Sequence, residues 1–167
     1  MNATVFACNY ALLRFRPYAD GGEFANVGIV LWSEPAGFFD YCCDTRCKER
    51  VKAFFPRLDA AIFEQALREM AAEIERVGKR IAGAANNRPA PASHKPMATQ
   101  YVETLRTPQP KQMYQELIRM REGMLTFGPD STALTEDPKA LMAELIARHL
   151  VPESQRDTVG PMVGQAA

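Results

Sequence analysis

The sequence predicts an α+β fold, in which helices cover one face of a small antiparallel β-meander. Three short extended segments open the chain, and segments with helical spacing of apolar residues follow them. The connections between the extended segments are short, and short connections join antiparallel neighbours. This order, strands first and helices afterwards, is typical of the α+β class.

The extended segments are rich in β-branched and aromatic residues, which favour strands. In the second segment apolar side chains alternate along the chain, at Ala25, Val27, Ile29 and Leu31. Pro and Gly recur in the two connections, residues 17–22 and 34–37, as turns require. We therefore expect strands over residues 5–16, 23–32 and 38–43.

The register of the first two strands can be predicted from their side chains. Pairing residues so that one face of the hairpin is wholly apolar gives a half-buried antiparallel sheet. The expected apolar pairs are Leu13 with Val27, Phe15 with Ala25, and Ala11 with Ile29. On the reverse face, Arg14 then lies opposite Asn26 and Leu12 opposite Gly28.

Helices are expected after the strands. The first is capped by Asp44 or Thr45 and ends at Pro56. The second covers residues 59–81, because its apolar residues alternate in steps of four and three. The later elements are a helix over residues 111–122, an edge strand over 124–127, and a last helix that begins at Asp137 and Pro138 and continues to about Leu150.

The length of 167 residues fits a single domain with a substantial core. We expect this domain to cover residues 1–152, with a frayed C-terminal tail at 153–167. Residues 82–110 are rich in Pro and lack periodicity, so we expect a mobile insertion there, with a short element near 101–105.

Charge and hydropathy limit the partners and the compartment. Lys plus Arg and Asp plus Glu both number 20, so a global preference for polyanions is not expected. The apolar run 28–32 is far too short to cross a bilayer, and the first residues do not resemble a signal peptide. These observations predict a cytoplasmic protein without a membrane partner.

The most unusual local pattern lies in the second strand, where Asn26 and Gly28 interrupt a strong strand sequence. A glycine inside a strand often marks a bulge or the close approach of another group. We define a candidate binding face by the residues that the predicted register gathers there: Tyr10, Arg14, Arg16, Glu23, Asn26 and Gly28. The alternative is structural, with Asn26 satisfying backbone groups of the hairpin and Gly28 making room for a crossing helix.

Two sequence motifs and the closing helix resemble one bacterial family. The motifs are Tyr10-Ala-Leu-Leu-Arg14-Phe-Arg-Pro17 and Gly22-Glu-Phe-Ala-Asn26-Val-Gly28. The family is a domain of unknown function, number three-zero-three-seven, and the resemblance covers most of the chain except the Pro-rich middle. Its members are often encoded beside a kinase-like protein that resembles HipA toxins. The resemblance therefore implies a HipA-like kinase as a partner.

The cysteines do not have the spacing of a structural zinc site. Cys42, Cys43 and Cys47 form neither a C-x-x-C pair nor two such pairs. Cys47 also falls on the apolar side of its helix, where a thiol behaves as a small hydrophobe. We predict free thiols in a reducing compartment, no metal and no cofactor.

The first helix is basic. Residues 45–57 carry several cations, Arg46, Lys48, Arg50 and Lys52 among them, and such a cluster could contact phosphates. However, cations at alternating positions spread around a helix, and no aromatic residue lies between them to stack on bases. A solvated helix face is the structural alternative.

The sequence favours binding over catalysis. It lacks a P-loop, a dinucleotide-binding glycine fingerprint, a G-x-S-x-G elbow and an H-E-x-x-H motif. Our first hypothesis is a non-enzymatic accessory or regulatory protein that binds another protein, such as a HipA-like kinase. The alternatives are a nucleic-acid-associated protein that uses the basic helix, and a hydrolase or nuclease that uses Glu23, Asn26 and Arg14.

Overall fold

The computed structural model confirms the α+β class and the opening antiparallel meander. It describes residues 3–44, 47–86, 108–119 and 123–151. The strands are β1 Phe6–Phe15, β2 Ala25–Ser33, β3 Phe38–Cys43, β4 Leu125–Phe127 and β5 Ser131–Thr135. The helices are α1 Lys48–Phe54, α2 Ala60–Asn86, α4 Pro110–Ile118 and α5 Pro138–His149.

The strands form one sheet in the order β3-β2-β1-β4, and β5 also pairs with β1. Strands β4 and β5 lie one after the other along the same edge of β1, each antiparallel to it. Between them the register moves by one residue, because Leu13 pairs with Phe127 whereas Tyr10 pairs with Ser131. The expected edge strand at 124–127 is confirmed as β4, and β5 is an additional strand.

A bulge in β2 changes the predicted register. The pairs Arg14–Asn26 and Phe15–Ala25 are confirmed, but beyond them Leu13 pairs with Gly28, so Val27 is an extra residue without a partner on β1. The other predicted pairs are therefore wrong: Ala11 lies opposite Val30 instead of Ile29, and Leu12 lies opposite Ile29 instead of Gly28. The bulge gives both faces of β2 a share of apolar residues, and β2 is buried from Val27 to Ser33.

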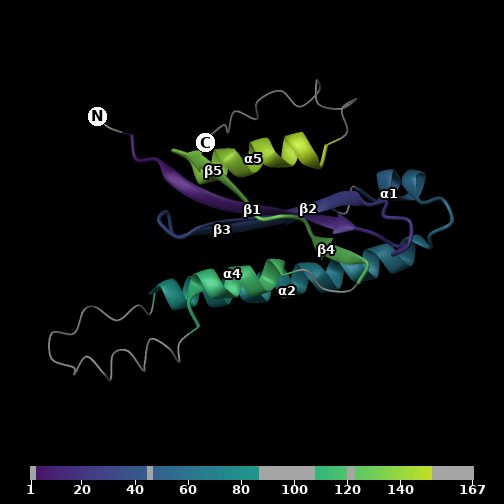
Figure 1. Ribbon diagram of the computed structural model, residues 1–167, viewed down its shortest axis with the longest axis horizontal. Coiled ribbons are helices and arrows are strands. Elements are labelled where there is room, and N and C mark those ends of the chain that lie inside the picture. The colour runs from purple at the N-terminus through teal and green to yellow at the C-terminus, as the bar shows by residue number, and fades with distance from the viewer. Residues whose placement is uncertain (1–2, 45–46, 87–107, 120–122, 152–167) are drawn as a thin grey trace, which may run out of the picture.

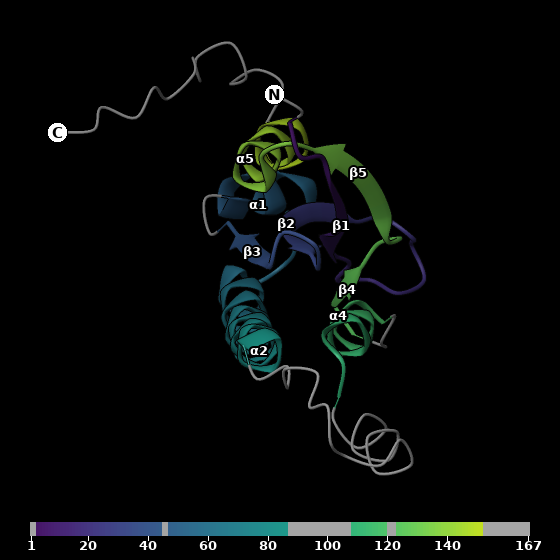
Figure 2. The ribbon, with the colours of Figure 1, turned by 90° about the vertical axis from the view of Figure 1, so that its left-hand side faces the viewer.

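Helices cover both faces of the sheet, not the single face that was expected (Figures 1 and 2). Helices α2 and α4 lie on one side, over a core that includes Leu13, Phe15 and Trp32. On the other side α5 lies over a second core, in which Ile29 and Leu31 meet Leu145. A second layer is needed because the residues after the bulge point apolar side chains to both faces.

Most helix positions follow the sequence pattern, but their ends differ. Helix α2 continues to Asn86, so the first residues of the Pro-rich segment are helical; residues 87–107, with the short element expected at 101–105, lie outside the described residues. Helix α4 ends at Ile118 rather than near residue 122. The frayed tail expected at 153–167 also lies outside the described part of the chain. Within the described part, none of the helices is long and apolar enough to span a membrane.

The N-terminal caps differ between α1 and α5. Helix α1 begins after Cys47 rather than directly after Asp44 or Thr45, and Thr45 lies outside the described residues. The cap of α5 is confirmed, since the Asp137 carboxylate accepts hydrogen bonds from the Lys139 and Ala140 amides at 2.9 and 3.1 Å.

The turn between β4 and β5 is fixed by Asp130. One carboxylate oxygen accepts a hydrogen bond from the Tyr114 hydroxyl at 3.0 Å, and the other accepts one from the Asn9 amide at 3.1 Å. The Gly128 amide donates to the Leu12 carbonyl at 2.8 Å. These contacts hold the backbone of Gly128 beside β1, where the candidate site begins.

Candidate functional site

A row of polar residues crosses three strands at the end of the sheet where β1 stops and β2 starts. Asn26 on β2 pairs with Arg14 on β1, and Arg14 pairs with Thr126 on β4. Residues that pair directly across antiparallel strands point to the same face. The row therefore presents an amide, a guanidinium and a hydroxyl side by side.

The Arg14 side chain is held by an aromatic ring and a glycine. Its Cζ lies 4.3 Å from the centroid of the Phe24 ring, a cation–π contact. A Cβ atom on Gly128 would lie 2.8 Å from the same Cζ, so the guanidinium occupies space that only glycine leaves open. Phe24 itself keeps 41% of its surface exposed. Arg14 is thus fixed in place under a solvent-exposed aromatic ring.

Three arginines and Asn26 retain unpaired polar atoms. The Nε atoms of Arg14, Arg16 and Arg50 and the Oδ1 atom of Asn26 are buried and have no hydrogen-bond partner within the described part of the chain. Buried polar atoms are nearly always paired, because an unpaired one loses its water without compensation. Three donors and one acceptor on neighbouring residues are therefore an unusual concentration of unsatisfied groups.

Arg50 joins the basic helix to this row. Its guanidinium donates to the main-chain carbonyl of Asn26 and, at 3.1 Å, to that of Leu150 at the end of α5. A third contact reaches the Cys47 sulfur at 3.4 Å. Arg50 is therefore turned inward, linking α1, β2 and α5, and its positive charge lies beside the row.

The other cations of α1 do not form one surface with Arg50. Lys48 makes an ion pair with Glu64 on α2, and this pair raises the pKa of Lys48. Lys52 is exposed, and Arg46 lies outside the described residues. The cations of α1 that the structure describes therefore resemble a solvated helix face more than a stripe that binds phosphates.

The remaining residues of the candidate face are dispersed. Tyr10 packs against the core under α5, and Glu23 is exposed in the loop before β2. Gly28 is buried, where a Cβ would lie 2.7 Å from the Cys42 carbonyl oxygen and 3.2 Å from Leu13 Cβ. Gly28 makes room for the neighbouring strand β3, not for a helix.

Sequence reasoning missed three parts of the site. Phe24, Thr126 and Gly128 come from a loop, an edge strand and a turn, and only the register brings them to Arg14. Phe24 stands in the same Gly-Glu-Phe-x-Asn motif as Asn26 and could have been found there. Thr126 and Gly128 lie more than one hundred residues after Arg14, and their sequence gives no sign of the contact.

The cysteines lie in separate surroundings. Cys42 and Cys43 are adjacent on β3 and pack on opposite cores, and Cys47 is buried with Val51. Burial, with a smaller effect of Cys42, raises the pKa of the Cys43 thiol to about 12, so its thiolate is disfavoured at neutral pH. Among the residues that the structure describes, none of the His, Cys, Asp and Glu side chains gather in groups of three that could hold a metal ion.

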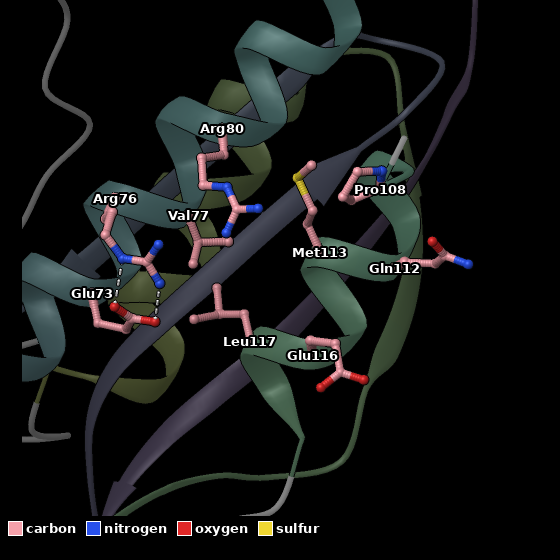
Figure 3. A pocket seen from close by; sticks show the side chains of 9 residues that line it. All are labelled: Glu73, Arg76, Val77, Arg80, Pro108, Gln112, Met113, Glu116 and Leu117. Atoms are coloured by element: carbon pink, nitrogen blue, oxygen red, sulfur yellow. Dashed lines mark hydrogen bonds and ion pairs between the residues drawn. The ribbon is translucent and has the colours of Figure 1, made fainter. Parts of the chain in front are cut away.

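A groove of about 470 Å³ lies between α2 and α4, on the other side of the sheet (Figure 3). Its apolar part consists of Val77, Pro108, Met113 and Leu117. On its rim Arg76 makes two hydrogen bonds to the Glu73 carboxylate, at 2.7 and 2.9 Å. The groove contains none of the residues that the sequence singled out.

Comparison with known proteins identifies the family. No curated protein and no solved structure matches the chain with significant similarity. One family model, described as a protein of unknown function (DUF3037), matches residues 10–151, which include the polar row, Phe24, Arg16 and Arg50. The chain belongs to this family, DUF3037.

Proposed function

We propose that the chain is a non-enzymatic accessory protein that binds another protein through the surface formed by Arg14, Arg16, Phe24 and Asn26, called here the arginine face. The observation that carries the proposal is the Arg14–Phe24 pair. A guanidinium lies under a ring that is 41% exposed, next to buried polar atoms that lack partners in the described residues.

This combination matches what protein interfaces use. Arginine and aromatic side chains are enriched among the residues that contribute most to binding, because they combine apolar area with directed hydrogen bonds. The Arg14 guanidinium is already held by Phe24 and by the backbone of Gly128, so little side-chain freedom would be lost on binding.

The family resemblance implies a HipA-like kinase as the partner, and the proposal adopts it. We expect the full chain to form a complex with a HipA-like kinase of the kind that the family resemblance implies, measured by isothermal titration calorimetry on the two purified proteins. Phe24→Ala and Arg14→Ala should each weaken binding by about tenfold or more, as central interface residues do.

The control is Leu134→Ala on β5, which also removes an exposed apolar side chain, 73% exposed, but lies away from the arginine face. It should bind like the unmodified chain. Equal affinity of all three variants would show that the complex uses another surface, and no complex at all would remove the kinase as the partner.

A further inference from the structure

We propose that the outer edge of β3, the edge that faces away from β2, binds an extended segment of a partner protein as an added antiparallel strand. Apolar side chains of that segment enter a groove between β3 and α2, and a basic side chain pairs with Asp40. This surface shares no residue with the arginine face. The inference therefore goes beyond the proposed function and does not rest on it.

The first observation is the direction of the main-chain groups of β3. The strand is last in the order β3-β2-β1-β4, and within the described residues no further strand pairs with its outer edge. The Asp44 amide donates to the Val27 carbonyl at 3.1 Å, and in an antiparallel ladder every second residue repeats that direction. Phe39 and Tyr41 fall at the intervening positions, so their amides and carbonyls point outward. Only another extended chain matches such a row of donors and acceptors.

Asp40 occupies part of this edge and decides against a second copy of the chain. Its side chain is exposed, and its Oδ1 accepts a hydrogen bond from the Tyr41 amide at 2.8 Å, which an incoming carbonyl can replace. Charged side chains on edge strands oppose self-pairing. Antiparallel pairing of β3 with its own copy about its middle would bring two Asp40 carboxylates opposite or diagonal to each other, an arrangement that like charges disfavour. The edge therefore fits a strand of different sequence.

A groove beside the edge, called here the β3 groove, accounts for the apolar part of that strand. It has a volume of about 320 Å³ and lies between β3 and α2, which runs under this margin of the sheet (Figures 1 and 2). Phe39 and Tyr41 line it from the strand, and Ile81 and the exposed Ala82 line it from the helix. Residues directly opposite Phe39 and Tyr41 on an added strand point to the same face and would enter the groove.

Gly78 keeps the strand and the helix close at this point. A Cβ atom on Gly78 would lie 2.5 Å from a carbon of the Phe39 ring, so the ring rests against the backbone of α2. The wall of the β3 groove is thus fixed before a segment binds, and little side-chain freedom of Phe39 is lost on binding.

The charges beside the groove favour a basic residue between the apolar ones. Lys79 is already paired with Glu75, at 2.9 Å, whereas Asp40 has no ion pair among the described residues. A residue directly opposite Asp40 on an added strand points to the same face as Asp40, and an opposite charge there is stabilising. The expected segment therefore alternates apolar residues with lysine or arginine.

The experiment uses the full chain labelled with nitrogen-15 and a short blocked peptide that alternates valine with lysine. Hydrogen exchange at single amides is followed by NMR, with the peptide at about ten times its Kd. We expect exchange at Phe39 and Tyr41 to slow by about tenfold, because a bound strand protects the outward amides. The amide of Asp40, which points to β2, should change little. A peptide that alternates valine with glutamate should bind about fivefold more weakly or less.

Main-chain pairing is tested by methylating the peptide nitrogens along one edge at a time. In the antiparallel arrangement the valines opposite Phe39 and Tyr41 direct their N–H groups to β3, and the lysines direct theirs away. Methylation of the valine nitrogens should weaken binding by about tenfold or more, as the loss of two hydrogen bonds predicts. Methylation of the lysine nitrogens is the matched control and should leave the affinity nearly unchanged.

Three variants test the side-chain contacts. Asp40→Lys should reverse the preference, so that the glutamate peptide binds more tightly than the lysine peptide. Ala82→Gln places a polar side chain in the β3 groove and should weaken the lysine peptide by about fivefold. Gly83→Gln adds the same side chain to the same helix at a position that does not line the groove and whose added Cβ meets nothing within 4 Å, so it should bind like the unmodified chain. Backbone spectra that match the unmodified chain show that the variants are folded.

The inference is overturned if the lysine peptide does not slow exchange at Phe39 and Tyr41, or if the two methylated peptides bind equally well. It is also overturned if Asp40→Lys still prefers lysine or if Ala82→Gln binds as tightly as the unmodified chain. A dimer of the chain alone in sedimentation equilibrium, with the same two amides protected, would assign the edge to a second copy instead. None of these results bears on the kinase experiment, which tests the arginine face.

Discussion

Val27 determines which side chains of β2 face which layer of helices. As the extra residue of a bulge, it separates Ala25, which packs towards α2, from Ile29, which packs towards α5. The alternation of inward and outward side chains that the sequence predicts is correct on each side of Val27, but at Val27 it shifts by one residue. A bulge adds one residue without altering composition, so the Arg14–Asn26 pair could be predicted while the pairs beyond it could not.

Gly28 gives a prediction at the same scale. Alanine at this position would place its Cβ 2.7 Å from the Cys42 carbonyl oxygen, and a main-chain oxygen in a sheet cannot move aside cheaply. We expect Gly28→Ala to lower the free energy of unfolding by about 1–3 kcal/mol, measured by urea denaturation.

The matched control is Gly83→Ala in α2, where the added Cβ meets nothing within 4 Å. Alanine is the better helix former, so this variant should be more stable by about 0.5–1 kcal/mol. A Gly28→Ala protein as stable as the original would mean that β3 does not approach β2 as closely as described.

At the scale of elements, periodicity was most informative for the helices. The steps of four and three that predict α2 correspond to its buried residues Phe63, Leu67, Ile74, Val77 and Ile81. Strand β5 was missed because it is an edge strand without a fully buried residue, and its Leu134 is 73% exposed. Such a strand carries little apolar alternation and is formed by pairing with β1.

The α5 cap provides a prediction for an element. The Asp137 carboxylate accepts from two amides at the start of α5, and Ala cannot do so. We expect Asp137→Ala to lower the free energy of unfolding by about 0.5–2 kcal/mol, measured by chemical denaturation at neutral pH.

Asp137→Asn tests whether the cap explains the loss. Asparagine caps helices about as well as aspartate, so this variant should recover most of the lost stability. An Asp137→Asn protein as unstable as Asp137→Ala would show that the cap hydrogen bonds do not stabilise α5.

For the whole molecule, helices cover both cores, and the Arg14–Asn26 pair of the arginine face lies where β1 ends, on the face of the sheet opposite Leu13 and Phe15. Arg50 contacts three elements there: β2, the end of α5 and, through Cys47, the start of α1. The sequence placed Arg50 and Asn26 in two different candidate sites. Only the folded arrangement unites them, because the contact joins residues from separate elements.

The central claim is that Asn26 is kept for binding and not for stability, and the free energy of unfolding of Asn26→Val tests it most directly. Valine suits a strand and removes the unpaired Oδ1, while the main-chain carbonyl can still accept from Arg50. Ser33→Ala is the comparison, since the buried Ser33 hydroxyl donates to the Ala7 carbonyl at 2.8 Å and its loss should cost about 1 kcal/mol. We predict that Asn26→Val is as stable as the original chain or more stable by up to about 1 kcal/mol. A loss of about 1–3 kcal/mol would contradict the claim and make Asn26 part of the scaffold.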